Sequence, residues 1–131
     1  MKPLHSLAAF AIAATFSIAS PALAHPQLVT ASPAQASAAR NVTRISLTFS
    51  EPLIAQLSGL EVVMTGMPGM SHAGSHGAMK MTGVRVSVGP GGKTLIATLA
   101  RPLPIGGYDV NWHAVSTDTH RVTGKLSFTV H

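Results

Sequence analysis

Short stretches of alternating or β-branched residues run along most of the chain, and turn signals such as SPAQAS, GPGGK and RPLPIGG separate them. Seven stretches fit this description: 27–32, 43–50, 60–65, 82–88, 94–100, 107–115 and 122–130. In two of them every second residue is apolar and falls on one face of a strand, namely Ile45, Leu47 and Phe49, and then Leu126, Phe128 and Val130. The pattern predicts an all-β domain of about seven strands, an antiparallel sandwich or small barrel of Greek-key type. At most one short helical turn is expected, in residues 51–59.

The first 24 residues have a different composition from the rest of the chain. Lys2 precedes an apolar run over residues 7–19, and the small-x-small triplet Ala22-Leu23-Ala24 follows. This is the build of a secretory signal peptide, and the run is too short to span a membrane. We therefore expect residues 1–24 to be removed, which leaves a single domain of residues 25–131 with His25 at its amino terminus.

Composition excludes several classes of function. The chain has no cysteine, so it can form neither a disulfide framework nor a thiolate site. Nine Lys and Arg against four Asp and Glu give a net charge of +5, but the basic residues are scattered singly. Such scatter is more typical of solubility than of nucleic-acid binding. Beyond the signal, no apolar run reaches membrane-spanning length.

One segment, residues 64–81, interrupts the rhythm of strands with glycines and a proline, and we expect a loop there. It holds every methionine of residues 25–131 and two histidines, namely Met64, Met67, Met70, Met79, Met81, His72 and His76. Thioether sulfur is a soft ligand that selects Cu(I), so the crowding indicates a Cu(I) site. Two alternatives stay open: Met64 and Met81 as core residues at strand ends, and a methionine-rich contact surface for a partner.

A second candidate site combines Asp118 and His120 with the expected amino terminus. In an extended segment a spacing of two places both side chains on one face, although such a pair alone is more typical of a solvated surface. A terminal His25 offers an amine and an imidazole to one ion. Pro26 has no amide hydrogen, so copper cannot displace a proton there and must recruit side chains from elsewhere. Amine, imidazole, carboxylate and a second imidazole suit tetragonal Cu(II).

Four segments, HPQLVTASPA, LTFSEPL, VMTGMPGMSH and VNWHAVSTDTHRVTGKLSFTV, resemble in content and order the CopC-type periplasmic copper-resistance proteins. The resemblance covers nearly all of residues 25–131. It implies an immunoglobulin-like β-sandwich or Greek-key barrel in the periplasm, which carries copper and works with an inner-membrane copper transporter. Members of the family can hold Cu(II) at one end and Cu(I) in a methionine-rich site at the other.

The resemblance also assigns site residues. It implies Cu(II) ligands at His25, Asp118 and His120, with Glu51 at an acidic position near them. For Cu(I) it implies Met64, Met67, Met70 and His72, with Met79 or Met81 as further candidates. The segment AGSHGAMK lengthens the methionine loop and adds His76. His113 stands where members of the family often have arginine, and alternation with Trp112 predicts that it faces outward as a surface residue.

Three functions are compatible with these features. The first is a copper carrier or buffer without catalysis, in which a change of oxidation state favours a change of site. The second is a copper oxygenase with a histidine brace, although one tryptophan and one tyrosine supply few aromatic contacts for a polymer. The third is an immunoglobulin-like adhesion or assembly module with incidental metal affinity.

Overall fold

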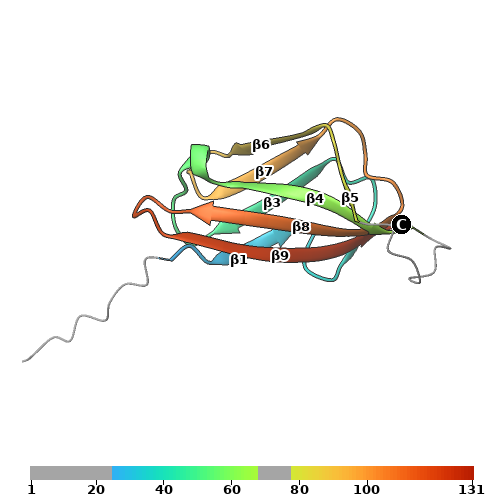
Figure 1. The fold of residues 1–131 in the computed structure, drawn as a ribbon, viewed down its shortest axis with the longest axis horizontal. Helices are drawn as coiled ribbons and strands as arrows, with labels where there is room; N and C mark the ends of the chain where they lie inside the picture. The colour runs from blue at the N-terminus through green and yellow to red at the C-terminus, as the bar shows by residue number, and fades with distance from the viewer. Residues whose placement is uncertain (1–24, 68–77) are drawn as a thin grey trace, which may run out of the picture.

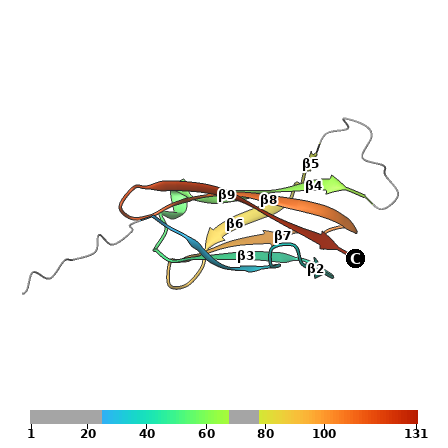
Figure 2. The same ribbon diagram turned by 90° about the horizontal axis from the view of Figure 1, so that it is seen from below.

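The computed structural model describes residues 25–67 and 78–131, which form two packed β-sheets (Figures 1 and 2). The first sheet contains, in spatial order, β1 (Leu28–Ser32), β3 (Arg44–Phe49), β7 (Thr94–Leu99) and β6 (Val84–Val88). The second contains β2 (Ala38–Ala39), β9 (Arg121–Val130), β8 (Gly106–Val115), β4 (Gly59–Gly66) and β5 (Met79–Lys80). All neighbouring strands pair antiparallel except β2 and β9.

The seven strands predicted from the sequence are all present, within two residues of the expected bounds. The predicted helical turn is also confirmed, as the 3-10 turn η1 (Ala55–Leu57). The strands β2 and β5 were not predicted, because two residues are too few to show alternation. β5 and the end of β4 also correct the expected loop of residues 64–81, since both termini of that segment are paired strands.

The order of the strands is that of an immunoglobulin domain. With β1, β3, β4, β6, β7, β8 and β9 taken as strands A to G, one sheet has the order A-B-E-D and the other G-F-C. This is the constant-type arrangement. The fold class predicted from the sequence is therefore confirmed as an immunoglobulin-like sandwich.

The core lies between the two sheets, and the predicted inward faces are correct. Ile45, Leu47 and Phe49 on β3 are at most 1% exposed. On β9, Leu126, Phe128 and Val130 are at most 5% exposed. The tyrosine of β8 adds a corner contact that the periodicity did not predict. The buried Tyr108 donates a 2.6 Å hydrogen bond from its hydroxyl to the carbonyl oxygen of Pro104. This tyrosine corner fixes the turn into β8.

Trp112 on β8 joins the two sheets. Its ring packs edge-on against Phe49 of β3, with ring centroids 5.0 Å apart. Opposite Trp112 on β9 stands Gly124, and a Cβ there would lie within 2.6 Å of Trp112 Cε2. The indole therefore needs a residue without a side chain beneath it. In the immunoglobulin domains of antibodies, a disulfide joins the strands that correspond to β3 and β8, and this chain cannot form it because it has no cysteine.

The long hairpin of β8 and β9 spans the sandwich from end to end. Its pairing runs without a register shift from Gly106 opposite Val130 to Val115 opposite Arg121. The loop that joins the two strands lies at one end of the molecule, whereas β4 reaches Gly66 beside Gly107 at the other (Figure 1). The eight residue steps from Gly107 to Val115, at about 3.3 Å each, separate the ends by about 26 Å.

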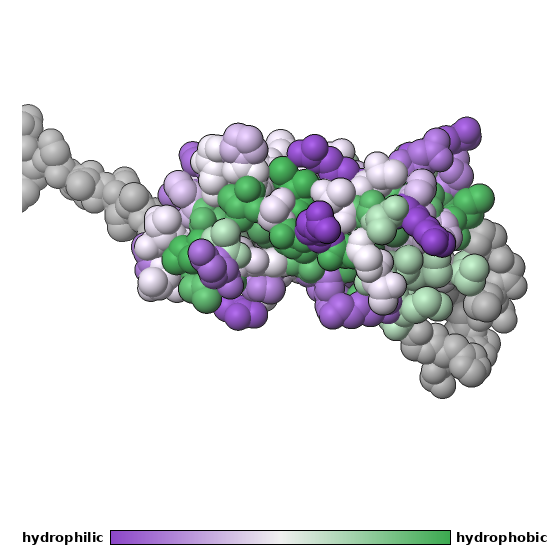
Figure 3. Space-filling model, turned by 90° about the horizontal axis from the view of Figure 1, so that it is seen from above, coloured by the Kyte–Doolittle hydropathy of each residue, from purple (hydrophilic) through white to green (hydrophobic). Residues whose placement is uncertain are grey.

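Figure 3 shows the side of the sandwich at β6, where apolar surface forms a band bordered by hydrophilic groups. β6 is the edge strand of its sheet, and its residues Val84, Val86 and Val88 are half-buried against the core. Between them stands the exposed Arg85. A charged side chain on an edge strand discourages pairing with another chain, so this edge is protected in the usual way.

The contact between Trp112 and Gly124 generates a stability prediction. Gly124→Ala should lower the free energy of unfolding by about 1–3 kcal/mol, because the added methyl group displaces the indole. Gly66→Ala is the matched control, since a Cβ there meets no atom of residues 25–67 and 78–131 within 4 Å, and it should change stability by no more than about 0.5 kcal/mol. Urea unfolding followed by circular dichroism measures both. Equal stability of the two variants would contradict the packing described for Trp112.

Candidate metal centre

The loop between β8 and β9 is a tight turn over residues 116–120. The amide of Thr119 donates to the carbonyl of Ser116 at 2.9 Å, and the amide of Ser116 donates to the carbonyl of His120 at 3.1 Å. Thr119 has φ of 72°, a conformation that β-branched residues rarely adopt. The turn thereby holds Asp118 and His120 next to each other at the tip of the hairpin.

Both oxygens of the Asp118 carboxylate accept hydrogen bonds. The Ser116 hydroxyl and the His120 amide donate to Oδ1, and Nδ1 of the His120 ring lies 2.9 Å from Oδ2. The hydrogen bond from Ser116, followed by that from the His120 ring, lowers the pKa of Asp118 to about 2. Asp118 is therefore ionised at any ordinary pH, as a metal-binding carboxylate must be.

The side chain of His25 lies beside this hairpin. Pro26 is fully buried, and Gln27 makes two hydrogen bonds with Ser50. The Gln27 amide donates to Ser50 Oγ at 2.9 Å, and the Ser50 amide donates to the Gln27 carbonyl oxygen at 2.8 Å. These contacts anchor the segment and leave the exposed His25 ring 4.5 Å from the His120 ring, centroid to centroid, at 82°. The fold thus places the three predicted Cu(II) ligands at one end of the sandwich, with the His25 ring against the His120 ring, although His25 precedes Asp118 by 93 residues and His120 by 95.

Glu51 follows directly after Ser50, which bonds to Gln27, so Glu51 lies at the same end of the sandwich as His25. Its side chain is half-buried. Among residues 25–67 and 78–131, however, no three His, Asp or Glu side chains are gathered closely enough to form a ready metal site. Glu51 as a ligand therefore stays a prediction. The arrangement at the hairpin is one Asp–His pair with a second histidine ring against it.

At the opposite end of the sandwich, the described methionines differ in exposure. Met64 on β4 is 7% exposed and belongs to the core, which is one of the two roles that the sequence left open for it. Met67 and Met79 are 45% and 61% exposed. The remaining candidates Met70, His72 and His76 lie outside the described residues. Two thioethers are thus available to solvent at this end of the described fold.

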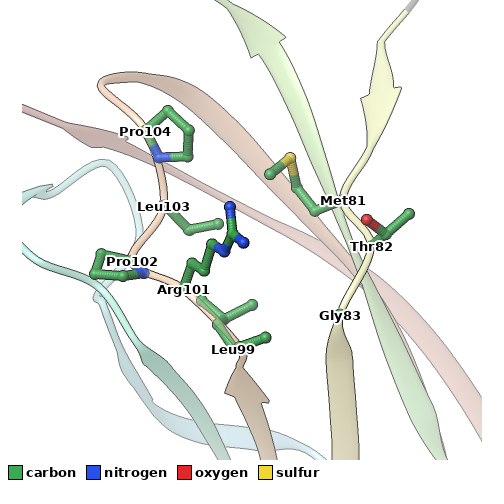
Figure 4. Close-up of a pocket in the computed structure, with 9 residues that line it drawn as sticks. Met81, Thr82, Gly83, Leu99, Arg101, Pro102, Leu103 and Pro104 are labelled. Carbon is green, nitrogen blue, oxygen red and sulfur yellow. The ribbon is translucent and has the colours of Figure 1, made fainter.

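Met81 has a different environment from the other methionines. It is partly buried against the core and lines a pocket of about 320 Å³ together with Leu99, Leu103 and Arg101. Figure 4 shows the Arg101 side chain extending across this pocket toward Met81. A guanidinium repels a cation, so this environment favours packing over copper binding for Met81.

The predicted surface position of His113 is confirmed. It lies on the outer face of β8, opposite Gly59 of β4, and its side chain is half-exposed. A Cβ on Gly59 would lie 3.1 Å from His113 Cε1, so the glycine leaves room for the ring to lie flat over the sheet. The two histidine rings that contact each other at the hairpin are those of His25 and His120, and His113 is not part of the candidate centre.

Two features of the centre were not predicted from the sequence, namely the role of Ser116 and the burial of Pro26. The Ser116 hydroxyl bonds to the Asp118 carboxylate. A serine two residues before an aspartate in a turn is a sequence pattern from which this contact could have been predicted. The burial of Pro26, which anchors His25, leaves no trace in the local pattern because it depends on packing at the end of the sandwich.

Fold and donor groups together define an immunoglobulin-like β-sandwich with nitrogen and oxygen donors at one end and thioethers at the other. The family model described as the CopC domain matches residues 28–131, and the chain belongs to the CopC family. No helix in the described ranges is long and apolar enough to cross a membrane.

Individual relatives agree with this assignment. Copper resistance protein C of Pseudomonas syringae pv. tomato is 45% identical over 111 residues, which cover 83% of this chain and 82% of the relative. Copper resistance protein C of Escherichia coli is 42% identical over 113 residues, 86% of each chain. The crystal structure of PcoC, a methionine-rich copper resistance protein from Escherichia coli, superimposes with a TM-score of 0.73 at 40% identity and covers 82% of this chain and 100% of that one.

The hydrogen bonds of Asp118 generate a prediction about pH. Because its pKa in the folded protein lies below the ordinary 3.8, the ionised group stabilises the fold fully above about pH 4, and this contribution is lost as the pH falls through about 2. A carbon-13 NMR titration of the metal-free protein should give a midpoint near 2 for the Asp118 carboxyl. Ser116→Ala should raise it, whereas Thr119→Ala, whose hydroxyl bonds only to the backbone oxygen of Asp118, should not. A midpoint near 3.8 in the unmodified protein would contradict these contacts.

Proposed function

We propose that this protein binds copper in the periplasm and passes it on, as a carrier or buffer without catalysis of its own. The observation that carries the proposal is the convergence of His25, Asp118 and His120 at one end of the sandwich. Support comes from the family, whose relatives are named for copper resistance.

The geometry of Asp118 and His120 suits a tetragonal ion. Two ligands bound at right angles, each about 2 Å from a metal, lie about 2.8 Å apart. The Oδ2 atom of Asp118 and the Nδ1 atom of His120 are 2.9 Å apart, so both can reach one copper ion once the ring turns its Nδ1 lone pair toward it. A carboxylate and imidazoles are the donor set that Cu(II) accepts.

His25 supplies the remaining nitrogen donors once the leader is removed. In the full-length chain its backbone nitrogen is an amide, which is a poor ligand. Cleavage after Ala24 converts it into an amine that can chelate copper together with the ring. Because Pro26 has no amide hydrogen and is fixed in the core, the terminus cannot wrap the ion locally. It is directed toward the hairpin, whose His120 ring already contacts His25.

The role of His25 can be tested with protein that the cell has exported and processed, with its terminus verified by mass spectrometry. His25→Ala should abolish tight Cu(II) binding in a competition titration, and so should one extra residue before His25, because each removes a nitrogen of the chelate. Affinity should also fall as the pH falls, since protons compete for the amine and the ring.

Gln27→Ala, which leaves the amine, the ring and the backbone contacts of this segment in place, is the matched control and should bind Cu(II) as the unmodified protein does. Tight binding by the protein with an extra terminal residue would overturn the proposed chelate. Retention of tight binding by His25→Ala would favour an adhesion module with incidental metal affinity.

For Cu(I) we propose a site at the opposite end, built on the exposed thioethers of Met67 and Met79. Met70, His72 and His76 belong to the same stretch of sequence and complete the candidate donors. The separation of about 26 Å means that one ion cannot be shared between the ends. Reduction of copper then favours its release from nitrogen and oxygen and its capture by sulfur. An inner-membrane copper transporter is the proposed recipient.

The methionines allow a matched comparison. Replacing both Met67 and Met79 with Leu should weaken Cu(I) binding at least tenfold, because sulfur is lost while the apolar volume is kept. Met64→Leu should leave Cu(I) affinity unchanged and cost less than about 1.5 kcal/mol of stability, since Met64 is a core residue. Titration under reducing conditions with a colorimetric Cu(I) chelator measures all three proteins. A larger loss from Met64→Leu than from the double variant would contradict the assignment.

The proposed absence of catalysis rests on the same proposed donor set. Asp118 as a third side-chain ligand occupies a coordination position that oxygen activation requires to be open. The oxygenase alternative predicts oxidative cleavage of a polysaccharide in the presence of a reductant. If such cleavage is observed, the oxygenase replaces the carrier as the proposed function.

A further inference from the structure

Ser116 lies between the end of β8 and the Asp118–His120 pair of the candidate centre. It follows directly after β8, it is 2% exposed, and it bridges to Leu53 across the sandwich end. Its amide and carbonyl are both bonded within the hairpin, to His120 and Thr119. The backbone of Ser116 is therefore fixed from two sides before its side chain is considered.

The Ser116 hydroxyl points from this fixed backbone to Asp118, where it donates to Oδ1. The amide of His120 donates to the same oxygen at 3.2 Å. The terminal torsion of an aspartate is broad and nearly two-fold, so a free carboxylate would rotate. Two donors on Oδ1 fix the plane of the group and leave Oδ2 facing Nδ1 of His120.

We propose that Ser116 is a positioning residue for Cu(II) binding, which aims one defined oxygen of Asp118 at the ion next to His120. This inference rests on the proposed Cu(II) site. Ser116 itself is not a ligand, because its buried hydroxyl is directed at the far oxygen of the carboxylate. It acts on copper only through Asp118, in the manner of the outer groups that orient metal ligands in other proteins.

Ser116→Ala in the processed protein should weaken Cu(II) binding by about 10- to 100-fold, the usual cost of losing such a group. Its Cu(II) EPR spectrum should also change in the parallel hyperfine splitting, because the oxygen donor is no longer held in one orientation. Loss of general stability would not alter that spectrum in the folded fraction.

Ser127→Ala is the matched control. The Ser127 hydroxyl donates to Asp109 Oδ1 at 2.6 Å, which is the same kind of bond on the outer face of the long hairpin. Its removal should leave both affinity and EPR spectrum unchanged. Ser116→Thr keeps the hydroxyl and should restore the spectrum of the unmodified protein, with circular dichroism confirming that each variant is folded.

The His25→Ala variant distinguishes failure of the proposed Cu(II) site from failure of the positioning role of Ser116. If the unmodified protein binds Cu(II) tightly and His25→Ala does not, the site stands. An unchanged affinity and spectrum for Ser116→Ala would then overturn the positioning role alone, as would a folded Ser116→Thr that behaves like Ser116→Ala. If the unmodified protein fails to bind Cu(II), the proposed function itself fails.

Discussion

The contact between Phe49 and Trp112 is the constraint on which the rest of the molecule depends. A chain without cysteine must hold its two sheets together by packing alone, and this aromatic pair occupies the place between β3 and β8 where related domains carry a covalent bond. The pair fits because Gly124 leaves space beneath the indole. With β8 and β9 locked in this way, their loop projects from a rigid base, and the positions of Asp118 and His120 follow from it.

Folding arranges the side chains of the candidate centre, but it does not provide every proposed donor. Hydrogen bonds fix the Asp118 carboxylate beside His120, and burial of Pro26 delivers the His25 ring to the same place. The free amine of the proposed Cu(II) site would come from cleavage after Ala24 and not from folding. Under the proposed function, preorganisation of the hairpin lowers the cost of ordering Asp118 and His120 around an ion.

The sequence allowed much of the fold to be predicted, because alternation over five or more residues is a strong local signal. It located seven strands, the inward faces of β3 and β9, and the outward position of His113. It could not predict features that depend on contacts between distant segments. The burial of Pro26, the space at Gly124 and the arginine beside Met81 all arise where elements far apart in the chain meet. Likewise, it indicated which residues could bind copper but not that Ser116 holds one of them.

The separation of about 26 Å between the hairpin loop and the methionine end has an energetic consequence. Substitutions that far apart, with no shared neighbours, have nearly additive effects. Under the proposed function, the donors at one end can therefore be substituted with little effect on the other end. The sandwich thus acts as a spacer that keeps the two ends energetically independent within a single small domain.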